Sequence, residues 1–219
     1  AVFSSYPGTT VNLNHAVAVD SSGNVYTTGY FYGTVDFDPG AGTANLTSQG
    51  FMDVFVSKLD SSGNYVWAKS FGGTSRNQGY SVAVDSSGNV YTTGHFDGTV
   101  DFDPGAGTTN LTASGNDVFV SKLDSSGDYV WAKSFGSTNT DHGYSVAVDS
   151  SGNVYTAGYF GQASQHSNRW ADFDPGAGTE NLTASSNTGN VFVSKLDSSG
   201  DYVWAKRFAG ASTGRAESV

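Results

Sequence analysis

The sequence predicts an all-β chain built from repeated four-stranded antiparallel units, and three observations support this. Glycine supplies 29 of the 219 residues and recurs beside Ser, Asn, Asp and Thr, a composition that suits tight turns and disfavours helix interiors. Apolar and polar residues alternate over short stretches, which is the period of a strand. Near-identical strings recur along the chain, so one small unit is repeated. With 37% hydrophobic and 14% aromatic residues, the chain has enough apolar surface for a folded core.

The repeated unit is about 65 residues long and occurs three times. One string, VAVDSSGNVYT, begins at Val17, Val82 and Val146. A second string, VFVSKLDSSG, begins at Val54, Val118 and Val191. We therefore predict a single array in which the units are residues 15–79, 80–143 and 144–216, with an insertion at 161–171 in the third. Residues 1–14 are predicted to form a terminal strand and linker, and residues 217–219 to start a further unit.

Each unit contains two hairpins. In the second copy, strands are predicted at residues 80–85, 89–96, 117–124 and 129–135. The turns fall at 86–88 and 125–127, where Gly88 and Gly127 occupy the position at which a positive φ is least costly. In the fourth strand both faces are mostly uncharged, which is expected of small sheets packed face to face.

Four short antiparallel strands per repeat, stacked around an axis, describe a blade of a β-propeller. A β-solenoid is the competing architecture, but its coils are usually shorter and lack two tight hairpins per unit. The strings VAVDSSGNVYTTG, DFDPGAGT and DVFVSKLDSSGDYVWAKSFG together resemble the SBBP family of bacterial β-propeller repeats. This resemblance implies a propeller fold and an extracellular or cell-surface location in large secreted proteins. It implies no common activity, because a fold alone does not specify a function.

The charge balance limits the class of partner. Twenty acidic residues against ten basic ones give a formal charge of −10, and the bases are scattered along the chain. Binding to nucleic acid is disfavoured because it depends on Lys and Arg that neutralise phosphates. Membrane insertion is not expected, since no apolar run approaches the length of a spanning helix. Without cysteine there are no disulfides and no thiol chemistry.

The motif DFDPGAGT is the strongest chemical signal. Its acidic residues form three pairs, Asp36 with Asp38, Asp101 with Asp103, and Asp172 with Asp174. Alternation in an extended segment would place both carboxylates of a pair on one side, where hard oxygen ligands suit Ca²⁺. The alternative is that these acids cap turns and keep a sheet edge soluble. Calcium at these pairs is the only cofactor that the sequence suggests.

The insertion at 161–171 is predicted to lie on the propeller face that carries the long loops, opposite the DSSG turns. It contains His166, Arg169 and Trp170, which are candidates for binding a glycan or a surface protein. Neutral variation in a solvent loop is the alternative. The repeated residues Trp67, Trp131 and Trp204 are predicted to pack between blades rather than to bind sugars. His15, His95 and His142 align with Tyr or Gln in other copies, so packing is the expected role there too.

The ends of the array point to association. Residues 1–6 align with a fourth strand and residues 218–219 with the opening of a first strand, which is too little to close a ring of about four to eight blades. We expect a homo-oligomer or polymer through terminal strands, as a ring or a filament, or a piece of a longer chain. The predicted function is that of a non-enzymatic, extracellular structural or interaction protein. The alternative is a ligand- or glycan-binding propeller, and an enzyme is disfavoured because no set of nucleophile, base and orienting group recurs.

Overall fold

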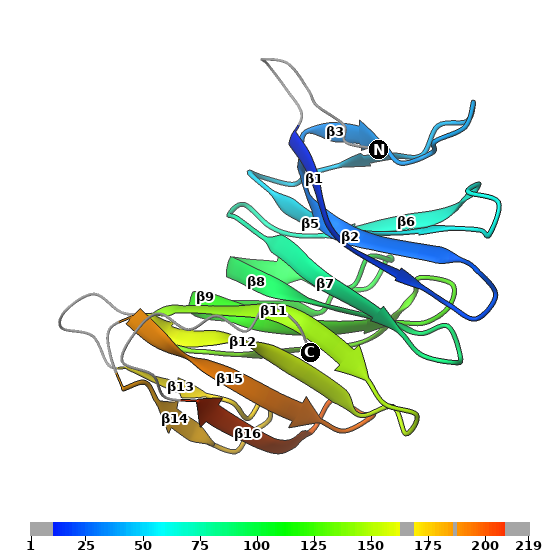
Figure 1. Ribbon diagram of the computed structural model, residues 1–219. Helices are drawn as coiled ribbons and strands as arrows, with labels where there is room; N and C mark the ends of the chain where they lie inside the picture. The colour runs from blue at the N-terminus through cyan, green and yellow to red at the C-terminus, as the bar shows by residue number, and fades with distance from the viewer. Residues whose placement is uncertain (1–10, 163–168, 186–187, 209–219) are drawn as a thin grey trace.

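The computed structural model describes residues 11–162, 169–185 and 188–208, and every regular element in these ranges is a strand. The strands form three blades that follow one another along the array (Figure 1). Blade 1 contains β1 (Val11–Val19), β2 (Val25–Tyr32), β5 (Asp53–Leu59) and β6 (Tyr65–Phe71). Blade 2 contains β7 (Gln78–Val84), β8 (Val90–Asp101), β9 (Asn110–Leu123) and β10 (Tyr129–Phe135). Blade 3 contains β11 (Thr140–Val148), β12 (Val154–Gln162), β15 (Thr188–Leu196) and β16 (Tyr202–Phe208).

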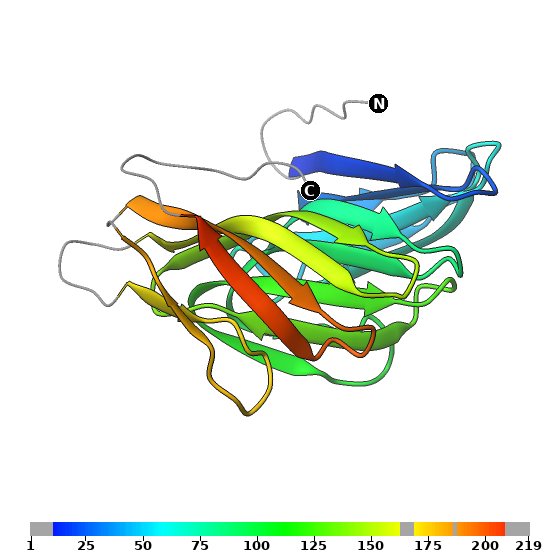
Figure 2. The same cartoon turned by 60° about the horizontal axis from the view of Figure 1, so that its bottom comes forward.

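Within each blade the strands are antiparallel and pair in sequence order. The four strands per unit predicted from the sequence are confirmed, as is the all-β class. A short hairpin that carries the DFDPGAGT motif projects from every blade. It is formed by β3 (Thr34–Asp36) with β4 (Asn45–Thr47), by the far ends of β8 and β9, and by β13 (Trp170–Asp172) with β14 (Asn181–Thr183). The first strands β1, β7 and β11 lie beside one another, and the described residues form an open array (Figure 2).

The DSSG turns are held by their own aspartates. In the first turn of blade 2, Asp85 Oδ1 accepts hydrogen bonds from the backbone N–H of Ser87 and of Asn89, both at 2.9 Å. Its Oδ2 accepts from Asn89 Nδ2 and from the hydroxyl of Tyr91. Gly88 has a φ of 79°, a conformation that a residue with a Cβ rarely adopts. These local bonds explain why the sequence Asp-Ser-Ser-Gly recurs at each of these tight turns.

A β-bulge interrupts the first hairpin of each blade. In blade 2, Gly79 pairs with Gly94 and Ser81 pairs with Thr93, so the register shifts at Tyr80. The register shifts in the same way at His15 in blade 1 and at Tyr144 in blade 3. The bulge brings the carbonyl of Gln78 so close to Gly94 that a Cβ there would lie 1.8 Å from the oxygen. Glycine is therefore required at this position by a close approach of two backbones.

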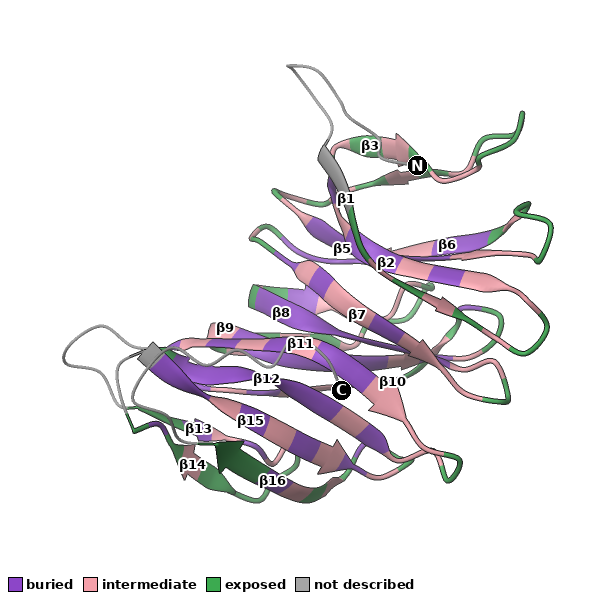
Figure 3. Cartoon of the chain, viewed as in Figure 1, coloured by how far each residue is buried: buried purple, intermediate pink, exposed green. Residues whose placement is uncertain are grey.

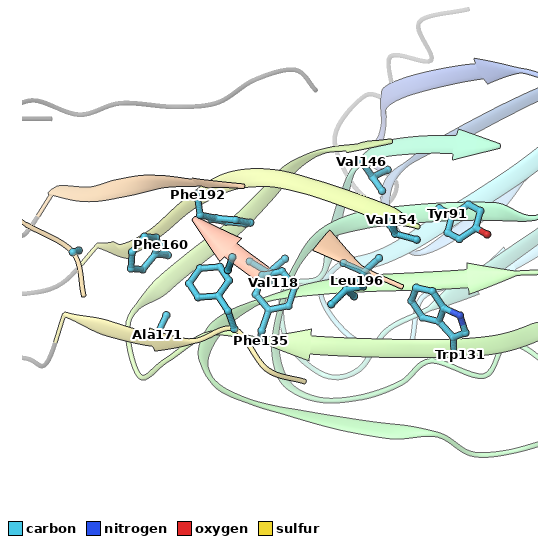
Figure 4. Packing of buried hydrophobic residues seen from close by; sticks show 14 residues of the cluster. Tyr91, Val118, Trp131, Phe135, Val146, Val154, Phe160, Ala171, Phe192 and Leu196 are labelled. Atoms are coloured by element: carbon cyan, nitrogen blue, oxygen red, sulfur yellow. The ribbon is translucent and has the colours of Figure 1, made fainter. Parts of the chain in front are cut away.

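The core lies between blades rather than within one sheet. One cluster joins blades 1 and 2, and another joins blades 2 and 3. In the second cluster Phe135 from β10 contacts the rings of Phe173 and Phe192 in the next blade, at centroid distances of 5.2 and 5.7 Å. Figure 4 shows Phe135 and Phe192 in this cluster. Phe71 contacts Phe102 and Phe119 in the equivalent way. The central Phe of each DFD segment thus anchors its projecting hairpin to the blade core.

Candidate interaction surface

The contact between successive blades is built by the same side chains at both junctions. Trp67 of β6 donates its indole N–H to the carbonyl of Ser125 at 3.2 Å, and Trp131 of β10 donates to Ser198 at the same distance. Each ring covers the glycine of the turn that it meets, Gly127 or Gly200, where a Cβ would come within 3.1 Å of the indole. The prediction that the tryptophans pack between blades is confirmed for Trp67 and Trp131, which are both 8% exposed.

A lysine follows each of these tryptophans on the same strand face. Lys69 Nζ lies 3.5 Å from Asp128 Oδ1, and Lys133 Nζ lies 3.4 Å from Asp201 Oδ1. Both acids are exposed, so each ion pair adds little to stability. The two pairs occupy the same position of the turn at both junctions.

Blade 1 has an uncovered face. We call the side of blade 1 that is turned away from blade 2 the leading face, and it contains Val17, Val19, Val25, Phe37 and Leu59. Val17 is 62% exposed, whereas its counterparts Val82 and Val146 are 7% and 5% exposed because a preceding blade covers them. The leading face is therefore a junction surface that lacks its partner among the described residues.

Blade 3 has the complementary uncovered face. We call the side of blade 3 that is turned away from blade 2 the trailing face, and it contains Tyr155, Val191, Val193, Trp204 and Phe208. Phe208 is 59% exposed, whereas Phe71 and Phe135 at the same position of β6 and β10 are 2% and 4% exposed. Figure 3 shows the end of β16 coloured as exposed. Large apolar surfaces of this kind mark sites of association.

The DFDPGAGT acids hold their own hairpin together. Asp101 Oδ1 accepts the backbone N–H of Asp103 at 3.0 Å and of Thr109 at 2.8 Å. Asp103 Oδ1 accepts the N–H of Gly105, and its carboxylate lies against Gly107, where a Cβ would clash with Oδ2. The pairs Asp36–Asp38 and Asp172–Asp174 make the same bonds. The acids therefore cap the turn of the hairpin, which is the alternative to calcium binding that the sequence analysis gave.

No further ligands gather around these pairs. Across residues 11–162, 169–185 and 188–208, no group of three or more His, Asp or Glu side chains is placed to hold a metal ion. In the same ranges no helix is long and apolar enough to cross a membrane. Calcium binding at the Asp pairs stays a prediction.

The insertion is described only in part. His166 lies outside the described residues. Arg169 donates from Nη1 to the carbonyl of Ser185 at 3.3 Å, and its own carbonyl accepts the N–H of Ala184. Trp170 opens β13 and is 42% exposed. The structure thus places Arg169 and Trp170 next to each other at the base of the projecting hairpin of blade 3, and a glycan-binding role for them stays a prediction.

The histidines join an aromatic row along the first two strands of the blades. His95 stacks on His142 with ring centroids 4.0 Å apart and an interplanar angle of 15°. The bulge residues His15, Tyr80 and Tyr144 continue the row, with 5.3 Å and 5.2 Å between successive rings. Burial lowers the pKa of His95 to about 3, and the neighbouring His142 acts in the same direction. His95 is therefore neutral at physiological pH and packs as an aromatic ring.

A polar groove lies between the DSSG turns of blades 2 and 3, and its carboxylates already have hydrogen-bond partners. It has a volume of about 400 Å³, and Asp85, Asp149 and Lys122 are among its lining residues. Both carboxylates already accept hydrogen bonds from their own turns. Lys122 Nζ lies 5.2 Å from the centre of the Tyr91 ring. These groups stabilise the turns and make no arrangement for acid–base or nucleophilic chemistry.

Two buried acids at the junction of blades 2 and 3 were not recognised in the sequence. Asp141 is fully buried, and its carboxylate accepts hydrogen bonds from the N–H of Gly161 at 2.6 Å and from the hydroxyl of Ser137 at 2.9 Å. Burial raises the pKa of Asp141 to about 7 and that of Asp117 to about 6. Aligning the copies shows that Asn77 takes the place of Asp141 in blade 2 and Asn190 that of Asp117 in blade 3.

We expect Asp141→Asn to stabilise the protein at pH 8 by about 1 to 3 kcal/mol. The folded chain holds a proton on Asp141 that the unfolded chain loses near pH 4, so this group favours folding at low pH. That contribution is lost as the pH rises from about 4 to about 7. Blade 2 already has an asparagine at the equivalent position, Asn77, and its Nδ2 donates to the carbonyls of Met52 and Ser75.

Urea unfolding of both proteins at pH 5 and pH 8 measures this effect. The difference between variant and wild type should be larger at pH 8 than at pH 5. The reverse change, Asn77→Asp, is the matched control and should lower stability more at pH 8. An Asp141→Asn variant that is equally destabilised at both pH values would contradict the assignment.

Comparison with known proteins agrees with this architecture. The family model for the SBBP beta-propeller repeat matches residues 66–98 and 130–159. An uncharacterized WD repeat-containing protein of Acanthamoeba polyphaga mimivirus is 34% identical over 110 residues, which cover 43% of this chain and 8% of that protein. The regulatory protein FlaEY of Caulobacter vibrioides is 32% identical over 111 residues, which cover 50% of this chain and 12% of that protein. The chain thus spans about a tenth of the length of these relatives.

A solved structure of a protein of unknown function from Bacteroides caccae aligns with 93% of this chain and 83% of its own, at 11% identity and a TM-score of 0.30, too distant a likeness to bear on fold or function. Each segment matched by the family model runs from the tryptophan strand of one blade, through the linker, to the second strand of the next. The matched unit therefore includes the junction between blades as well as a hairpin. Residues 66–98 and 130–159 thus match the model of the SBBP beta-propeller repeat, and the described part of the chain is an all-β array of propeller-type blades.

Proposed function

We propose that this chain is a non-enzymatic structural or interaction module that works outside the cell or at its surface and associates through its two uncovered blade faces. The exposure of Phe208 on the trailing face and of Val17 on the leading face is the observation that carries the proposal. In the interior of the array, residues at both positions are buried by a neighbouring blade. The two faces correspond to the two sides of the contact between successive blades, so they are complementary to each other. The extracellular location rests on the resemblance to SBBP repeats.

The repetition supports a role in binding rather than catalysis. The residues that recur in all three copies make turns, bulges and blade contacts, as the DSSG aspartates and the tryptophan strand show. The acids in the groove of the DSSG face and in the projecting hairpins accept backbone hydrogen bonds. What varies among the copies is the loop face, which is where a propeller of this kind would distinguish partners.

Thermal unfolding at a series of protein concentrations tests the association. A chain that associates in its folded state gains stability by mass action, so its melting temperature should rise as the concentration is raised. The rise should persist at high salt, because the uncovered faces are mainly apolar. A melting temperature that does not change with concentration would overturn the proposal.

A further inference from the structure

A hollow lies on the leading side of blade 1, between its projecting hairpin and its second DSSG turn. Its volume is about 320 Å³, and it is lined by Asp38, Pro39, Gly40, Gly63, Asn64 and Tyr65. Gly63 has no atom within 4 Å of the place that a Cβ would take, apart from its chain neighbours. The equivalent glycines, Gly127 and Gly200, are covered by Trp67 and Trp131. The hollow is thus the position that a tryptophan occupies at both internal junctions.

Blade 3 presents the strand that fills such a hollow elsewhere in the molecule. β16 has the sequence YVWAKRF, while β6 and β10 have YVWAKSF. In β6 and β10 the tryptophan and the lysine reach the DSSG turn of the next blade, and the final Phe enters its core. Trp204, Lys206 and Phe208 carry these three groups on the trailing face, where Lys206 and Phe208 are exposed.

We propose that the trailing face of one copy packs on the leading face of a second copy, with Trp204 and Lys206 entering the hollow at Gly63. This rests on the proposed function and names the partner as a second copy of the chain. The contact joins two different surfaces, so it is heterologous and each copy uses both its faces in different contacts.

One polar group distinguishes the contact between copies from the internal junctions. Asn64 stands in blade 1 where Asp128 and Asp201 accept the lysine ion pair in blades 2 and 3. Lys206 would therefore meet an amide instead of a carboxylate. Asn64→Asp should restore the ion pair and lower the dissociation constant of the dimer by about two- to fivefold at low salt.

Light scattering coupled to size exclusion tests this contact. Wild type should elute with a mass of at least twice 22.8 kDa. Phe208→Asp places a charge in the core of the contact and should raise the dissociation constant at least about tenfold. Val203→Asp is the matched control on the same strand, because Val203 is 45% exposed and its counterparts Val66 and Val130 are 44% and 43% exposed inside the array. This control should leave the mass unchanged.

Mixing two variants tests whether the contact is heterologous. Phe208→Asp alters only the trailing face, and Val17→Asp alters only the leading face. Each alone should be monomeric, while an equimolar mixture should form a dimer through its one intact contact. If both variants dimerise as well as wild type, this inference is overturned, whereas the proposed self-association still stands. A wild-type monomer at all concentrations would overturn both.

Discussion

Replacing Trp131 with Ala is expected to lower the free energy of unfolding by about 3 to 5 kcal/mol, the range for truncating a large buried aromatic side chain. The indole lies in the cluster that joins blades 2 and 3, covers Gly200, and donates its N–H to the carbonyl of Ser198. The variant leaves a cavity at the junction and an acceptor without its donor. Chemical denaturation followed by circular dichroism measures the loss.

Trp204→Ala is the matched control for this change. Trp204 occupies the same position of β16, but no blade follows it among the described residues, and it is only partly buried. At a concentration where the chain is monomeric, its truncation should cost less than half as much as that of Trp131. Equal losses at the two positions would show that burial between blades is not the source of the stability.

Replacing Gly94 with Ala is expected to cost at least about 3 kcal/mol, although the change adds a single methyl group. The new Cβ would lie 1.8 Å from the carbonyl oxygen of Gln78 and 2.8 Å from a ring carbon of Phe119. The oxygen belongs to the backbone of a paired strand, so the strain can be relieved only by separating β7 from β8 at the bulge. The midpoint of thermal unfolding should fall by many degrees.

The hairpin tip offers the control. Gly105 is exposed, and a Cβ there would approach only the Asp103 carboxylate, at 3.0 Å. Gly105→Ala should therefore change stability by no more than about 0.5 kcal/mol. A Gly94→Ala variant as stable as Gly105→Ala would mean that the bulge is not a fixed feature of the blade.

Much of the architecture follows from local sequence alone. The DSSG turns are determined by contacts within six residues, since Asp85 bonds to Ser87, Asn89 and Tyr91. Period-two alternation then gives the strands, and the repetition of these pieces gives the blade and its count. The role of the tryptophans was predictable too, because they recur in register on a strand whose two faces are mostly uncharged.

Other features depend on how successive blades pack and so leave no local trace. His95 and His142 belong to different blades and stack on each other, and Asp141 is buried at the junction of blades 2 and 3. The DFD acids could be read from the sequence as calcium ligands or turn caps. Their backbone partners lie only two and eight residues away, but the sequence does not show in which direction each carboxylate points. Local sequence is therefore sufficient for the single blade. The packing of blades decided which copies of the same side chain are buried and which, like Phe208 and Val17, remain open to a partner, because burial depends on a neighbouring blade and not on the residue.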